Sequence, residues 1–520
     1  MAEPDSLLEL ALGAIAKYIY ELCSKLTMIS HDTKERSTPK KQKLNCPMDM
    51  QKVKEICISL KKMIAEVPTD LANDLTNKLL DSVDNWEYQI GKCKKESIQA
   101  KIYEDIVMSI IHPGLTAIEH GEELLECEGM FSETVFCSSL CVTVLLKNLY
   151  SFRNLRKLYV RHESMKCKFT SIEFPEQLIE FSGVCTNEIL DKIMKSCKKL
   201  KYLDIMGSRG ITDVSVDVLL KMTHLEKLNI TNTRITHKGI KCFLGGLIEI
   251  YGKSPSLKYF GFSCKGFQHF SCLENLPELK ISLGLFPGQF ANNIGFSQMC
   301  AFKNICGLQI ETTLDNLNEL LQKMGKQLIY LDAQIEYIGP NSDNEDFAEV
   351  VKIGQYCSVL KCLHISISYY FLPCILNYRR QLLPGFQTIR CLLFEVQDQN
   401  TIKSADCFLY FLISQCSNVR KLTLAFDKRM FDVFHFIYLS VQLDYMKKIE
   451  YICFQPFCDK CSGASIDDEN FFVRSKVREI LNLLTAHCSG LRVIGLEQTY
   501  MKRLCNSQRL RFVPTWCACE

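Results

Sequence analysis

The sequence predicts an α/β protein, a solenoid of stacked strand-and-helix repeats preceded by an all-helical N-terminal region. Three observations predict this fold. The chain has 520 residues, more than one compact core normally holds. A short strand-like motif recurs through most of its length. Between the copies, apolar residues recur three or four positions apart, which is typical of helices.

The recurring motif is apolar-x-x-apolar-x-apolar, whose last two apolar residues have the period of two of a half-buried strand. In the copy at 200–205, Leu203 and Ile205 are expected to point inward while Asp204 faces out. Copies that begin at 360, 389, 419 and 449 are separated by 29, 30 and 30 residues. This motif and spacing predict leucine-rich repeats, in which one strand and one helix make each turn of the solenoid. Further copies begin at 155, 200, 225, 257, 305 and 491.

The segments between strands predict helices with one apolar stripe each. Leu314, Leu317, Leu321 and Met324 give the clearest example. Such a stripe can be buried only against the helix's own strand and its neighbours. Copies between 276 and 335 match the motif poorly, so the repeat count and register over 265–335 stay open.

Composition excludes several classes of function. The 62 basic and 59 acidic residues leave a net charge of +3, which gives no reason to expect a nucleic acid or a membrane as partner. No apolar run reaches the length of a membrane span, and the N-terminus lacks the features of a secretory signal. The 28 cysteines are therefore expected to be reduced, buried thiols, in a cytoplasmic or nuclear protein.

The first 144 residues differ in character from the repeats. Residues 1–30 predict an amphipathic helix that begins with a capping box formed by Ser6 and Glu9. The polar, basic segment 31–47 predicts a flexible linker. Residues 48–144 predict a helical adaptor and capping region, and 145–520 the solenoid. Within 48–144, Pro68 opens a helix whose leucines recur every four residues.

These motifs resemble those of ubiquitin-ligase receptors. The order Ser-Leu-x-x-x-Ala-x-x-x-Ile from Ser6 resembles the BC box, although Ala11 stands where that motif usually has Cys. A BC-box helix followed by a proline-opened helix resembles the Zyg eleven-related family of leucine-rich-repeat receptors. The resemblance implies elongin binding and cullin or adaptor contact. The elongin-binding residues would be Leu7, Leu8, Ala11 and Ile15, and the cullin-contacting residues Pro68, Leu71, Leu75 and Leu79.

A cysteine also precedes several strand motifs by three residues. This spacing resembles the cysteine-containing repeats of F-box receptors, and it occurs at Cys197, Cys357, Cys416 and Cys488.

The resemblance implies a substrate-recognition subunit of a cullin–RING E3 ubiquitin ligase. Its partners would be elongin B/C, a cullin and a protein cargo bound on the concave strand face. The residues expected to meet cargo are Tyr202, Asp204, Lys227, Asn229, Tyr259 and His364. Three alternatives stay open: an F-box-type receptor that binds the Skp adaptor, a non-catalytic repeat scaffold, and an N-terminal region that merely caps the first repeat.

No catalytic function is expected. The chain has no phosphate-binding loop, dinucleotide fingerprint, nucleophile elbow or HExxH motif. It is therefore expected to be neither an enzyme nor a cofactor binder. Four thiols could form a tetrahedral zinc site, although free surface thiols are the simpler interpretation. They are Cys458, Cys461, Cys517 and Cys519.

Overall fold

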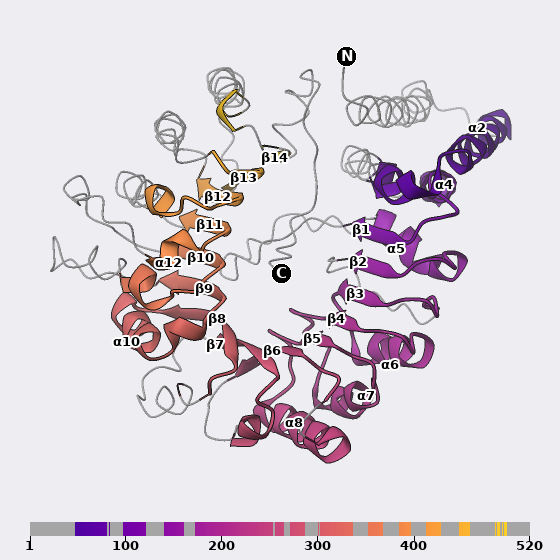
Figure 1. Cartoon of the computed structure of the whole chain (residues 1–520). Coiled ribbons are helices and arrows are strands. Elements are labelled where there is room, and N and C mark those ends of the chain that lie inside the picture. The colour runs from indigo at the N-terminus through magenta and orange to yellow at the C-terminus, as the bar shows by residue number, and fades with distance from the viewer. Residues whose placement is uncertain are drawn as a thin grey trace, which may run out of the picture. The chain divides into compact units, whose positions relative to one another are not determined.

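Figure 1 shows the computed structural model of the chain. The chain divides into two compact units, which are described separately. Unit 1 comprises residues 1–250 and 255–257, and unit 2 comprises 251–254 and 258–520. The structure describes residues 47–77, 79–80, 83, 97–120, 140–160, 172–252, 255–264, 271–285, 300, 302–335, 352–367, 384–396, 412–427, 447–457, 484, 486–488, 491 and 493–496.

Unit 1 is built on parallel strands whose spatial order follows the sequence. In Figure 1, α6 and α7 lie on one side of these strands. The strands are β1 (Ala117–His120), β2 (Lys157–Val160), β3 (Glu180–Gly183), β4 (Tyr202–Asp204) and β5 (Lys227–Asn229). The helices are α2 (Pro47–Ala65), η1 (Thr69–Leu71), α4 (Ser97–Ser109), α5 (Leu140–Lys147), η2 (Leu149–Ser151), α6 (Asn187–Ser196), η4 (Asp213–Ser215), α7 (Val216–Leu220) and α8 (His237–Tyr251).

Unit 2 repeats the same arrangement with longer strands, again parallel and in sequence order. The strands are β6 (Tyr259–Cys264), β7 (Lys280–Leu285), β8 (Ile305–Thr312), β9 (Tyr330–Ile335), β10 (Cys362–Ile367), β11 (Cys391–Val396), β12 (Lys421–Asp427), β13 (Tyr451–Phe457) and β14 (Val493–Leu496). The helices are η5 (Ser271–Asn275), α10 (Leu314–Met324), η7 (Gly325–Gln327) and α12 (Pro384–Gln387).

The core of each unit is a row of apolar side chains that the strand register brings together. In unit 1, Leu203 is the partner of Phe181 and Leu228, and all three are 0% exposed. In unit 2, Leu363 is the partner of Leu331 and Leu392, and none of the three is more than 2% exposed. Because side chains alternate along a strand, burying this row turns the intervening residues outward.

Each of the four cysteines that precede a predicted strand motif lies in the turn that leads into that strand. At Cys197 the amide donates to the Ile193 carbonyl (2.7 Å), and the cysteine carbonyl accepts from the Leu200 amide (3.2 Å). The cysteines at 357, 416 and 488 make the same two bonds, and all four are free and no more than 3% exposed. These four thiols are therefore small core side chains, as predicted, where each helix ends.

Each of the ten predicted strand motifs coincides with a strand of the structure. Four further strands, β1, β3, β7 and β9, were not predicted. Strand β1 corrects the prediction that the N-terminal region is all helical, because it pairs with β2 over its whole length. The helical region predicted from residue 48 onward does begin with a helix, α2. None of the helices among the described residues is both long and apolar enough to cross a membrane.

Candidate functional site

The outward positions of the parallel strands form the candidate site, and we call them the strand face of each unit. On unit 1, one row contains Lys157, Glu180, Tyr202 and Lys227, which the register places side by side. Neighbouring strands lie about 4.8 Å apart, so this row is a closely spaced set of polar and aromatic side chains.

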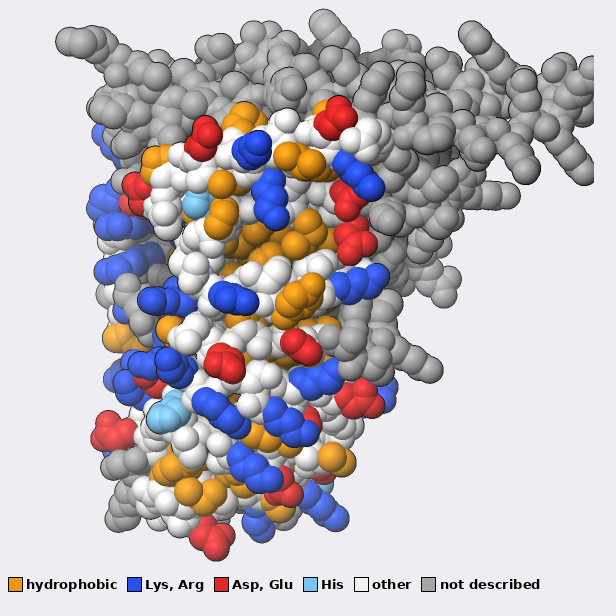
Figure 2. Space-filling view, turned by 90° about the vertical axis from the view of Figure 1, so that its right-hand side faces the viewer, with side chains coloured by type: hydrophobic (Ala, Val, Ile, Leu, Met, Phe, Trp, Pro, Cys, Tyr) orange, Lys and Arg blue, Asp and Glu red, His pale blue; other side chains and the backbone are white. Residues whose placement is uncertain are grey.

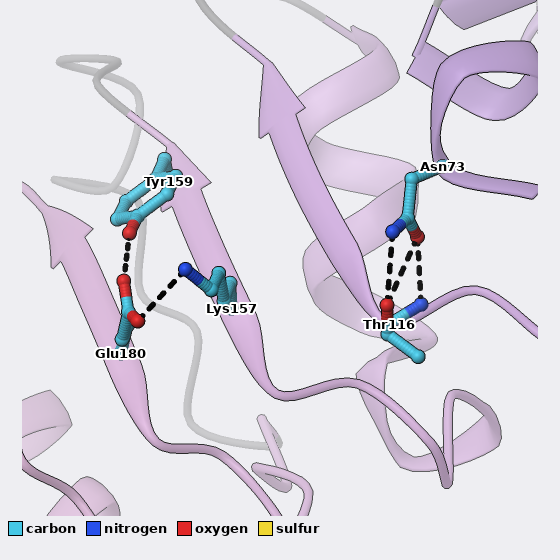
Figure 3. A network of polar contacts seen from close by, with 5 residues as sticks. All are labelled: Asn73, Thr116, Lys157, Tyr159 and Glu180. Atoms are coloured by element: carbon cyan, nitrogen blue, oxygen red, sulfur yellow. Dashed lines mark hydrogen bonds and ion pairs between the residues drawn. The ribbon is translucent and has the colours of Figure 1, made fainter. Parts of the chain in front are cut away.

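Glu180 lies on β3, and both of its carboxylate oxygens contact side chains of β2 (Figure 3). Its Oε1 lies 2.9 Å from Lys157 Nζ, and the Tyr159 hydroxyl donates to its Oε2. The Lys157 side chain is 46% exposed, so the ion pair itself adds little stability. The two contacts of Glu180 instead hold the side chains of Lys157, Tyr159 and Glu180 in fixed positions on the strand face.

Tyr202 and Lys227, both predicted to meet cargo, are register partners and partly exposed. Asp204, predicted to face out toward cargo, is only 3% exposed. Its Oδ1 accepts a hydrogen bond from the Met206 amide (3.1 Å), which folds the carboxylate back onto its own chain. Asp204 therefore closes the turn after β4 and offers almost no surface to a partner, which corrects the prediction that it meets cargo.

Asn229 makes the equivalent turn after β5. Its Oδ1 accepts from the Thr231 amide (3.1 Å) and hydroxyl (2.7 Å). Asn229 remains partly exposed. It therefore combines a structural role with some accessible surface.

On unit 2, His364 lies on β10 and Tyr259 on β6, and both are partly exposed. His364 Nδ1 is 2.8 Å from Asp332 Oδ1 on β9, and the Tyr330 hydroxyl donates to Asp332 Oδ2 (3.3 Å). The His364 side chain is 14% exposed, so a small part of its ring can meet a partner. Asp332 and Tyr330 were missed because β9 itself was not predicted.

Beside this cluster, Cys362 and Cys391 are register partners at the start of β10 and β11. Their thiols are hydrogen-bonded to each other, and Lys421 follows in the same row on β12. Neither cysteine could be singled out from the sequence, because neither belongs to a short motif and only the strand register brings the two together.

The proline-opened segment at 67–77 packs against β1 (Figure 3). Asn73 Oδ1 accepts from the amides of Thr116 (2.9 Å) and Ala117 (3.0 Å), and Asn73 Nδ2 donates to Thr116 Oγ1 (2.9 Å). The buried His112 adds a second link, because its Nε2 is 2.8 Å from the Val67 carbonyl oxygen. The Gly114 amide donates to His112 Nδ1 (2.8 Å), so that nitrogen is unprotonated and Nε2 is the donor.

The four residues predicted to contact a cullin differ in accessibility. Pro68 is exposed and Leu71 is half-buried, whereas Leu75 and Leu79 are 0% exposed. The two deeper leucines thus pack inside the N-terminal part of unit 1. They can meet a partner only if this segment leaves its place against β1.

The predicted elongin-binding residues, Leu7, Leu8, Ala11 and Ile15, lie outside the described residues, as does the candidate zinc cluster of Cys458, Cys461, Cys517 and Cys519. Within the described part of the chain, no group of three or more His, Cys, Asp or Glu side chains is placed to hold a metal ion.

The face of the molecule drawn in Figure 2 has basic and acidic side chains interspersed with hydrophobic ones. On this face neither sign of charge covers a large continuous area.

No family model matches the chain. None of the curated proteins matches it either. Among solved structures, the chain is similar to a leucine-rich-repeat protein of Leptospira interrogans, with 10% sequence identity and a TM-score of 0.23. The similarity covers 78% of this chain and 89% of the other.

The repeats themselves give the fold. Parallel strands follow one another in sequence order, the same turn precedes them, and one leucine-rich row fills the core. The chain is an α/β repeat protein of leucine-rich character.

Proposed function

We propose that the chain is a non-catalytic receptor that binds a protein ligand on the strand faces of its repeats. The observation that carries this proposal is the strand face of unit 1. Its polar and aromatic side chains are partly exposed and aligned by the register, and Glu180 fixes two of them. Repeat proteins commonly use such extended surfaces for partners. Tyrosine and charged side chains that are already ordered lose little entropy on binding.

The finer proposal is that the receptor delivers its ligand to a cullin–RING ubiquitin ligase. Its support is the resemblance of residues 6–16 to an elongin-binding helix, followed by the proline-opened segment at 68. A ligase supplies the chemistry itself, so a receptor of this kind needs no catalytic residues. Burial of Leu75 and Leu79 directs any cullin or Skp contact to the exposed Pro68 and the half-buried Leu71.

Affinity purification of the full chain, followed by mass spectrometry, tests the finer proposal. We expect elongins B and C and a cullin to co-purify with the natural chain. The double substitution Leu7→Ala with Ile15→Ala should reduce elongin recovery about 10-fold or more, because a buried anchor often contributes over about 2 kcal/mol to binding. Lys17→Ala, a polar residue of the same predicted helix, is the matched control and should leave recovery unchanged.

Two other outcomes would contradict the elongin proposal. Recovery of the Skp adaptor in place of elongins would favour an F-box-type receptor. Recovery of ligands with neither adaptor would leave a repeat scaffold, in which residues 67–77 act purely as the cap on β1 that Asn73 and His112 already form.

A further inference from the structure

Two cysteine side chains meet on the strand face of unit 2. Cys362 and Cys391 are direct partners in the parallel register of β10 and β11. Each is followed by a leucine of the buried row, so both cysteines occupy the outward position of their strand. Partner Cα atoms in a sheet are about 4.8 Å apart. That separation lies within the roughly 4.4–6.8 Å that a disulfide spans.

The two thiols are chemically unequal. The hydrogen bond with Cys362 lowers the pKa of Cys391, the positive charges of Lys421 and Arg390 act in the same direction, and partial burial opposes them. The same hydrogen bond, together with burial, raises the pKa of Cys362. Cys391 is therefore the more readily ionised thiol of the pair and is half-buried, whereas Cys362 is a buried thiol beside it.

We propose that Cys362 and Cys391 form a redox site that hydroperoxides oxidise to a reversible disulfide between β10 and β11. The Cys391 thiolate attacks one oxygen of the hydroperoxide, and the O–O bond breaks. This step leaves a sulfenic acid on Cys391 and releases an alkoxide or hydroxide, which takes up a proton.

The Cys362 sulfur then attacks the Cys391 sulfur. The S–O bond breaks, and the hydroxide leaves as water with the proton of the Cys362 thiol. In total two thiols give up two electrons and two protons, and the hydroperoxide is reduced by two electrons. A dithiol reductant reverses the change through a mixed disulfide.

Two other cysteines among the described residues, Cys357 and Cys242, serve as comparisons for the reactivity of Cys391. Burial raises the pKa of Cys357, in one of the turns, to about 12, so this thiol is neither ionised nor accessible. Cys242 is exposed on α8. If accessibility alone decided oxidation, Cys242 would react first. The proposed site predicts that Cys391 reacts first.

The test uses the full chain, reduced, desalted and treated with one equivalent of hydrogen peroxide at neutral pH. After alkylation and tryptic digestion without reductant, we expect peptide 391–403 cross-linked to peptide 362–379. Fragment ions must place the bond at Cys362, because Cys374 lies in the same peptide. Treatment with dithiothreitol should return both peptides in alkylated form. Cys391 should be consumed about 10-fold faster than Cys242, as expected for a thiol with a lowered pKa.

Three variants separate the steps. Cys362→Ser should leave a sulfenic acid on Cys391 that dimedone traps, whereas Cys391→Ser should abolish both the sulfenic acid and the cross-link. Cys242→Ser should behave as the natural chain. Oxidation of Cys242 before Cys391, or a cross-link from Cys391 to Cys374 instead of Cys362, would overturn the proposal. The natural chain alone can give either result, so the test does not depend on the variants folding.

Discussion

Asn73 shows how one side chain can complete a sheet. Strand β1 is the first strand of the sheet among the residues that the structure describes, so within that part of the chain no preceding strand accepts the amide protons at its start. Asn73 Oδ1 accepts from two of these amides, those of Thr116 and Ala117. A side chain from a helical segment thus accepts hydrogen bonds that a neighbouring strand would otherwise accept.

Asn73→Ala should therefore loosen the start of β1. Two amides would lose their acceptor, at a cost of about 1–3 kcal/mol in the free energy of local opening. Amide hydrogen exchange measured by mass spectrometry should speed up about 10-fold or more in peptides that cover 115–120. Asn154→Ala is the matched control, since Asn154 is exposed and makes a single 3.3 Å bond to the Pro113 carbonyl. Equal exchange rates in the two variants would contradict this role for Asn73.

Inward residues could be predicted from the sequence, whereas the polar pairs of the site could not. Leu203 and Ile205 are buried as predicted, because alternation along one strand decides their direction. The pairing of His364 with Asp332 depends on the register between two strands that are 32 residues apart in the chain. The burial of Asp204 depends on the turn after β4. Neither the His364–Asp332 pair nor the burial of Asp204 follows from the alternation of apolar and polar residues along one strand.

Helix α8 docks through a fixed carboxylate at its N-terminal end. Asp213 Oδ1 accepts from the Thr236 amide (2.7 Å), and its Oδ2 accepts from the Thr236 hydroxyl (2.7 Å). A Cβ added at Gly239 would meet this carboxylate, which cannot withdraw without losing both bonds. The same helix contains Gly245, where an added Cβ would have no heavy atom within 4 Å.

Two Gly→Ala substitutions in α8 should therefore have opposite effects. Gly239→Ala should lower the free energy of unfolding by about 1–3 kcal/mol, because a packed group must move. Gly245→Ala should raise it by up to about 1 kcal/mol, because alanine favours the helix. The midpoint of urea unfolding followed by circular dichroism measures both. A shift in the same direction for both variants would show that the Asp213 contact is unimportant.

Three of the four unpredicted strands break the apolar motif at one position. In β3 the third apolar position is Gly183, and in β9 it is the small Ala333. In β1 the equivalent residue is His120. Strand β7 keeps buried apolar residues two positions apart at Ile281, Leu283 and Leu285, but its register with β8 shifts between Ile281 and Ser282, because β8 has an extra residue there. Backbone pairing with flanking strands forms these elements despite the weaker local signal.

At the scale of the whole molecule, the proposed receptor separates two binding functions along the chain. The ligase contact is expected near the N-terminus, at Leu7 and Ile15, and the ligand contact on the strand faces. Repeat proteins allow this separation because each repeat contacts mainly its neighbours. Changes at one binding site should therefore leave the other intact.

This separation gives the last prediction. Tyr202→Ala with Lys227→Ala should lower ligand recovery about 10-fold or more while elongin recovery stays unchanged, because two contacts of about 1 kcal/mol each are lost. Leu7→Ala with Ile15→Ala should do the reverse. Lys147→Ala with Tyr150→Ala is the matched control, since both residues are exposed on α5 and η2 and lie on no strand. Quantitative affinity purification, with thermal melting to verify folding, measures all three. Loss of the same ligands from the Lys147/Tyr150 variant, or their full recovery with the Tyr202/Lys227 variant, would place ligand binding elsewhere than on the strand face of unit 1.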